Sequence, residues 1–106
     1  MDGKLIVAYA SGEITQRTLT KWPSLKELQE AVGGYIEKLP LPTNRHFEEC
    51  VDEHGNPQKC VAYCNEEGRL VGLPRNTSLI GKSISYPVVG NIAIVTGDSE
   101  FMSQRH

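Results

Sequence analysis

One short helix with a defined start and a defined end is the feature that most constrains how this chain can fold. Ser24 and Glu27 match a capping box, in which the serine oxygen accepts the free amide of the third helical residue and the glutamate reaches back. Gly33 and Gly34 end the helix, because glycine adopts the left-handed conformation beyond the last turn. The apolar side chains share one face at helical spacing: Leu25, Leu28, Ala31 and Val32. The sequence therefore predicts a helix over about residues 24–33 whose single apolar stripe packs on a sheet.

The rest of the chain supplies segments typical of a mainly antiparallel sheet. Residues 4–10 are rich in Leu, Ile and Val and predict an internal strand, and residues 13–19 predict its hairpin partner. Further strand-like segments follow along the chain: 35–39, 47–52, 58–64, 70–73 as a short strand or the entry into one, and 88–96, which Gly90 and Asn91 interrupt. We therefore predict a single small α+β domain over residues 1–97, with one principal helix on the sheet, and a polar, frayed tail over residues 98–106.

Composition bounds the functions that such a domain can have. The chain has 106 residues and is 39% hydrophobic, which predicts one domain with a thin core. A net charge of -2 argues against a general nucleic-acid binder, since those carry a basic excess. No apolar run is long enough to span a membrane, and no basic-then-apolar leader opens the sequence. We expect a cytoplasmic protein.

The three cysteines are Cys50, Cys60 and Cys64, and together with His46 they raise the question of a metal site. An odd count without a leader indicates reduced thiols in a reducing compartment. Cys60 and Cys64 are expected on one strand, about 13 Å apart, which is too far for two ligands of one zinc ion. The sequence therefore predicts free thiols without a metal.

No arrangement of side chains typical of an enzyme stands out. His46 and Cys50, four residues apart on a strand, would also be about 13 Å apart, so they do not form a nucleophile–base pair. Glu66 and Glu67 are neighbours in a turn, where their side chains diverge. Gly33 and Gly34 are not followed by the lysine and hydroxyl residue of a phosphate-binding loop. We expect a non-enzymatic protein without a cofactor.

Three ordered segments resemble the signatures of a small family of unknown function that is common in bacteriophages, plasmids and some bacterial genomes. They are LQEAVGGYIE at 28–37, NEEGRLVGLPRN at 65–76 and VGNIAIV at 89–95, and the likeness covers residues 25–97. The family has no established activity. The resemblance therefore implies a setting, an accessory protein of a mobile element in the host bacterial cytoplasm, rather than a chemistry.

The middle segment carries the candidate binding residues. Arg69 and Arg75 supply guanidinium groups that match phosphate or carboxylate, Asn65 and Asn76 supply amides, and Tyr35 offers a stacking face. A purely structural explanation is also open, in which Asn65 shapes a turn, Asn76 caps one, and both arginines are solvated. We expect that the protein binds and sequesters a small anionic, nucleotide-like ligand, such as a signal of host defence. A domain with a thin core would most easily build such a pocket between subunits, which predicts a homo-oligomer.

A different function is suggested by the acidic stretch 48–67. It gathers six carboxylates, Glu48, Glu49, Asp52, Glu53, Glu66 and Glu67. An exposed acidic ribbon could engage a basic surface of a host defence protein, which would make the chain a protein–protein inhibitor. Arginines in a concave site would favour the ligand hypothesis, and a continuous acidic ribbon would favour the inhibitor.

Overall fold

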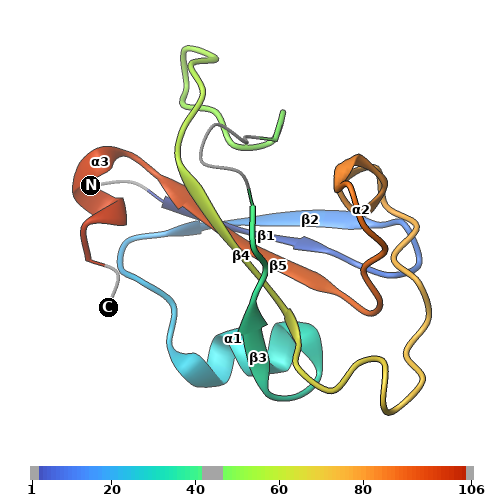
Figure 1. The fold of residues 1–106 in the computed structure, drawn as a ribbon. Helices are drawn as coiled ribbons and strands as arrows, with labels where there is room; N and C mark the ends of the chain where they lie inside the picture. Colours follow the sequence, from blue (N-terminus) through green and yellow to red (C-terminus); the bar gives the residue numbers. More distant parts are fainter. Residues whose placement is uncertain (1–2, 42–46, 105–106) are drawn as a thin grey trace.

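A computed structural model of the chain describes residues 3–41 and 47–104, and it contains one five-stranded antiparallel sheet with helices packed on it (Figure 1). The strand order is β2-β1-β5-β4-β3. The strands are β1 (Gly3–Ala8), β2 (Ile14–Leu19), β3 (Ile36–Lys38), β4 (Cys60–Asn65) and β5 (Ile92–Gly97). The helices are α1 (Leu25–Val32), α2 (Leu79–Ser83) and α3 (Ser99–Met102). The predicted α+β class with a mainly antiparallel sheet is confirmed.

The first hairpin forms as the sequence predicts. β1 and β2 pair antiparallel from Gly3 opposite Leu19 to Ala8 opposite Ile14, and β1 also pairs with β5, so β1 is an internal strand. The turn closes through a 2.8 Å hydrogen bond from the Tyr9 amide to the Glu13 carbonyl.

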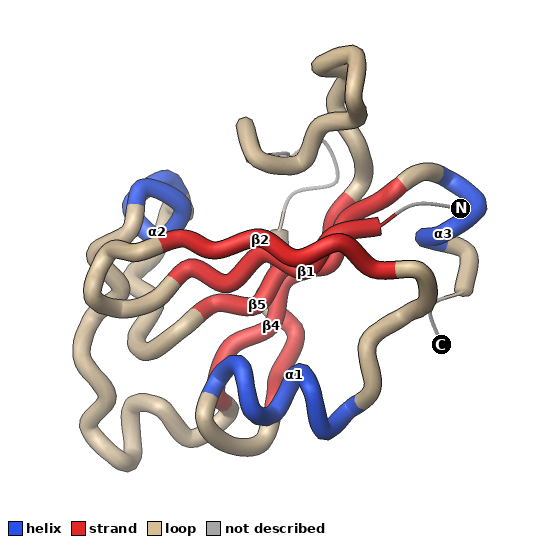
Figure 2. Tube along the Cα trace, turned by 180° about the vertical axis from the view of Figure 1, so that it is seen from behind, coloured by secondary structure: helices blue, strands red, loops and turns tan. Residues whose placement is uncertain are grey.

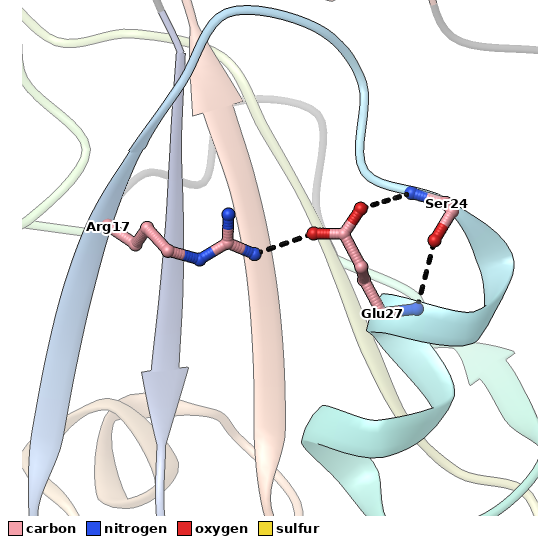
Figure 3. A network of polar contacts seen from close by, with 3 residues as sticks. All are labelled: Arg17, Ser24 and Glu27. Atoms are coloured by element: carbon pink, nitrogen blue, oxygen red, sulfur yellow. Dashed lines mark hydrogen bonds and ion pairs between the residues drawn. The ribbon is translucent and has the colours of Figure 1, made fainter.

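The capping box of α1 is present in full (Figure 3). The Glu27 amide donates to the Ser24 hydroxyl at 3.1 Å, and the Ser24 amide donates to the Glu27 carboxylate at 3.1 Å. Arg17 on β2 reaches the other carboxylate oxygen at 2.8 Å. The hydrogen bond from the Ser24 amide, and after it the hydrogen bond from Arg17, lower the pKa of the Glu27 carboxyl group below its ordinary value. The stabilisation that these contacts give the folded state is therefore present at neutral pH. It is lost in acid, as the carboxylate becomes protonated.

The buried part of the apolar stripe of α1 is shorter than predicted. Leu28 and Val32 are buried, but Leu25 is 60% exposed, so the prediction that Leu25 faces the sheet is wrong. At 100° per residue, Leu25 lies only about 40° around the helix from the midpoint between Leu28 and Val32, so the three side chains share one face. Leu25 is the first residue of α1, and the buried part of this face begins one turn later, at Leu28.

Removing the cap should destabilise the domain. We expect Ser24→Ala to lower the free energy of unfolding by about 1 kcal/mol, because the Glu27 amide loses its acceptor. Urea unfolding measures the difference. Ser24→Asn, which restores a capping oxygen, is the control and should remain within a few tenths of a kcal/mol of the wild type. Equal loss in both variants would contradict the capping role.

Alternation along the strands divides the core between the two faces of the sheet. One face carries Ile6, Ala8, Ala62, Ile92 and Ile94, and is covered by α2 and by the segment 47–50. The other face carries Leu5, Val7, Val61, Ala93 and Val95, and is covered by α1 and by Phe101 of α3. Figure 2 shows α1 lying along one side of the sheet. The sheet is thus covered on both faces, not by one principal helix alone.

Two of the predicted strands do not form. In the segment 47–52 only Val51 makes a β-bridge, and its partner is Pro57. A tight turn forms here instead of a strand, because the Cys50 amide donates to the Phe47 carbonyl at 2.9 Å. The Phe47 and Cys50 side chains are buried. The segment 70–73 lies in turns, and Leu70 is 85% exposed. Both segments have strand-like composition, but neither finds a strand edge to pair with along its length.

The final strand is interrupted at Gly90 and Asn91, as the sequence predicts, and its regular part follows the interruption. β5 starts at Ile92, because Gly90 adopts a positive φ of 77° that ends extended pairing, and Val89 makes only an isolated bridge with Arg75. A Cβ at Gly90 would also lie 2.9 Å from the Leu73 side chain.

The C-terminal segment is part of the fold, and the prediction of a frayed tail from residue 98 is wrong. Asp98 caps α3 by accepting from the Phe101 amide at 2.8 Å. Phe101 is fully buried and stacks on Trp22 with ring centroids 5.8 Å apart. A single aromatic side chain in a polar segment is enough to anchor it. Residues 105–106 of the predicted tail lie outside the described residues.

No helix within residues 3–41 and 47–104 is long and apolar enough to cross a bilayer.

Candidate ligand-binding groove

The end of α1 forms one wall of a groove. Gly33 has a φ of 79°, and its amide donates to the Gln29 carbonyl at 2.8 Å, which ends the helix as predicted. A Cβ at Gly33 would meet no atom within 4 Å, so this backbone faces open space. The chain then turns into β3 and leaves the Tyr35 side chain 65% exposed.

Asn65 joins this wall to the turn that follows β4. Its Nδ2 donates to the Val32 carbonyl at 3.3 Å, and its Oδ1 accepts from the Glu67 amide at 2.8 Å. The Glu66 amide donates to the Tyr35 carbonyl at 2.8 Å. A Cβ at Gly34 would lie 2.8 Å from Asn65 Nδ2, so only glycine fits here without a shift. These contacts fix the two walls relative to each other.

Between the walls lies an open groove of about 510 Å³. Residues of α1, of the helix end and of the 65–71 turn line it: Lys26, Gln29, Glu30, Gly33, Gly34, Tyr35, Asn65, Glu67 and Val71. Its volume falls in the range of small-molecule sites.

The charge of the groove is mixed. Lys26 is its cation and Glu30 and Glu67 are its carboxylates. The carbonyl end of α1 adds a partial negative charge. Such a lining favours a ligand of low net charge over a polyphosphate.

The structure brings together two of the five predicted site residues, Tyr35 and Asn65, in the groove lining. Arg69 and Arg75 are exposed but do not line the groove in the described part of the chain. Both contact the segment 87–89 instead: Arg69 Nη2 donates to the Pro87 carbonyl at 3.1 Å, and Arg75 forms its backbone bridge with Val89.

Asn76 serves the fold. It is buried, and its Nδ2 donates to the carbonyls of Ala8 at 2.9 Å and Gly90 at 2.8 Å, while its Oδ1 accepts from the amide and the hydroxyl of Ser78. The predicted cap at Asn76 is instead Ser78, whose hydroxyl accepts from the Gly81 amide at 2.9 Å. With all its polar atoms engaged, Asn76 has no free donor for a ligand.

Sequence reasoning missed Lys26, Gln29 and Glu30. They are the polar residues of an amphipathic helix, and the same pattern is typical of any solvated helix face. This helix face becomes a wall of the groove only because the end of α1 contacts the 65–67 turn, which is distant in the sequence.

The fold and the groove define a small α+β domain with a concave site beside its principal helix. A comparison with known families matches residues 4–105 to the domain of unknown function DUF3846, and the chain belongs to that family. No curated protein and no solved structure matches the chain significantly.

Proposed function

We propose that this protein binds and sequesters a small nucleotide-like ligand in the groove beside α1, without chemical turnover. The observation that carries the proposal is an exposed aromatic ring, Tyr35, held over a groove whose other wall offers the amide residue Asn65. Stacking on an aromatic side chain recognises the flat face of any base. Asn65 already bonds both walls, so its part is to hold the groove open at a fixed width.

The charges of the groove narrow the ligand class. Lys26 can neutralise one anionic group, while Glu30 and Glu67 oppose a second. We therefore favour a ligand with a single negative charge, such as a cyclic mononucleotide, over a nucleoside triphosphate. Arg69 and Arg75, proposed from the sequence as the phosphate ligands, would form a separate basic spot beside residues 87–89.

The setting of this function is the one that the sequence resemblance implies. A bacteriophage or plasmid accessory protein that captures a nucleotide signal in the host cytoplasm would blunt a defence system that depends on that signal. Sequestration needs affinity and abundance but no catalytic group. Since the groove is formed within one chain, the predicted homo-oligomer is not required for it.

Calorimetric titration with a cyclic mononucleotide tests the proposal. Tyr35→Ala should weaken binding by about tenfold or more, since stacking contributes about 1–3 kcal/mol per base. Lys26→Gln should weaken binding at low salt, because it removes the attraction between the ammonium group and the anionic ligand. Added salt screens the same attraction, so it should weaken binding by the wild type and reduce the difference between the two proteins. Arg75→Ala is the control and should bind like the wild type.

Two results would contradict the groove. Loss of binding in Arg75→Ala but not in Tyr35→Ala would move the site to the basic spot that the sequence suggested. Absence of binding by any cyclic mononucleotide, together with a host protein retained through residues 48–67, would favour the inhibitor.

The inhibitor hypothesis has less geometric support. Glu48 and Glu53 lie before β4, and Glu66 and Glu67 lie after it, so the strand runs between the two groups (Figure 1). A strand of six residues is about 20 Å long. The carboxylate of Asp52 is also engaged within its own loop, where it accepts from the amides of His54 and Asn56 at 2.8 and 2.9 Å. The acidic stretch is thus two clusters rather than one ribbon.

A further inference from the structure

A row of three side chains crosses the sheet at the end opposite the groove turn. Thr96 on β5 is the register partner of Lys4 on β1 and of Cys60 on β4. Directly paired residues project from the same face of a sheet, so the three side chains stand side by side. This face also carries the core cluster that contains Cys50.

Cys50 is held above that row by several contacts. The Lys4 ammonium donates to the carbonyls of Glu49 at 2.9 Å and Val51 at 3.1 Å, the two residues that flank Cys50. The Gln58 amide donates to the Cys50 carbonyl at 2.8 Å, which folds the chain back toward β4. The Cys50 side chain is fully buried and its thiol is hydrogen-bonded to the thiol of Cys60.

The two thiols differ in their access to solvent. Cys60 is half-buried, whereas Cys50 is enclosed. The hydrogen bond with the Cys60 thiol lowers the pKa of Cys50 below its ordinary value, and the Lys4 ammonium adds to this, although burial opposes it. A partly accessible thiol in contact with a buried one is an arrangement in which a first adduct can be resolved by its neighbour.

Cys64 provides an internal contrast on the same strand and face. Burial first, and then the Glu37 carboxylate, raise the pKa of Cys64 to about 11. Its thiol contacts Glu37 Oε1 at 3.9 Å rather than a second sulfur. Cys64 therefore remains a thiol under conditions in which an activated pair reacts.

We propose that Cys50 and Cys60 form a modification site for low-molecular-weight disulfides, which convert the pair to an intramolecular disulfide. The Cys60 thiolate attacks one sulfur of the small disulfide, an S–S bond to Cys60 forms, and one small thiolate leaves. The Cys50 thiolate then attacks the Cys60 sulfur, the Cys50–Cys60 bond forms, and the second small thiolate leaves. The protein dithiol is oxidised, the small disulfide is reduced to two thiols, and these take up the two protons that the cysteines lose.

The disulfide would close the loop between residues 50 and 60 and fasten it to β4. This loop carries Asp52 and Glu53, the first acidic cluster. The reaction is independent of the groove, because neither cysteine lines it.

The test equilibrates the native full-length chain in buffers of increasing oxidised-to-reduced glutathione ratio, followed by quenching, alkylation and mass spectrometry. We expect a species that lacks two hydrogen atoms and carries one alkyl group, with a peptide map that joins Cys50 to Cys60 and places the alkyl group on Cys64. Reducing buffer should restore three alkylated cysteines.

Variants separate the pair from the remaining thiol. Cys64→Ser should form the disulfide at the same glutathione ratio as the wild type, and Cys60→Ser should form no intramolecular disulfide. The wild-type peptide map decides the question even where a variant folds poorly. A disulfide that involves Cys64, glutathione adducts without a crosslink, or three free thiols at every ratio would each overturn the proposal.

Discussion

Replacing Phe101 with alanine is expected to lower the free energy of unfolding by about 3–5 kcal/mol, the usual cost of emptying a fully buried aromatic site. The ring is enclosed between the sheet and Trp22, and a Cβ at Gly3 would lie only 2.4 Å from it, so the ring sits directly on the first strand. Urea unfolding followed by Trp22 fluorescence measures the change, and the fluorescence of the native state should also shift as the stacked ring is lost.

Leu70→Ala is the control for this prediction. Leu70 is a large apolar side chain that is 85% exposed, so its removal should change stability by no more than about 0.5 kcal/mol. If Phe101→Ala were equally mild, the C-terminal segment would be the frayed tail that its polar composition suggests, and α3 would contribute nothing to the fold.

Local signals predicted the parts of the fold that local physics determines. The capping box and the glycine stop of α1 act within a few residues, and so does the β1–β2 hairpin. Residues 47–52 and 70–73 have strand-like composition, but strand formation depends on an available partner edge, which a sequence does not display. Phe101 is a single anchor without periodicity, so no pattern marked it.

The candidate site was predictable only in part, for a related reason. Tyr35 and Asn65 were identified because both stood in distinctive segments, and the structure places both beside the groove. The role of a polar side chain depends on whether the fold uses up its hydrogen-bonding capacity, and that depends on distant residues. Asn76 bonds to Ala8, 68 positions away, which no local motif indicates.

Asn76→Ala is expected to be about as damaging as a core truncation, with a loss of about 3 kcal/mol or more in the free energy of unfolding. The substitution leaves the buried carbonyls of Ala8 and Gly90 without this donor, and the Ser78 amide without its acceptor. Each buried polar group left unpaired costs about 1–3 kcal/mol. Differential scanning calorimetry and urea unfolding measure the loss.

Thr77→Ala is the matched control at the next position. Thr77 Oγ1 donates to the Ala10 carbonyl at 2.7 Å, but the residue is exposed, so water can replace the bond and the loss should stay within about 1 kcal/mol. The pair of variants separates two roles for the 74–78 segment. If Asn76 served to bind a ligand and not to stabilise the fold, Asn76→Ala would be as stable as the wild type but would have a lower affinity for that ligand. A strong loss of stability in Asn76→Ala alone would mean that this segment joins β1, β5 and α2, and that ligand binding must be sought in the groove beside α1.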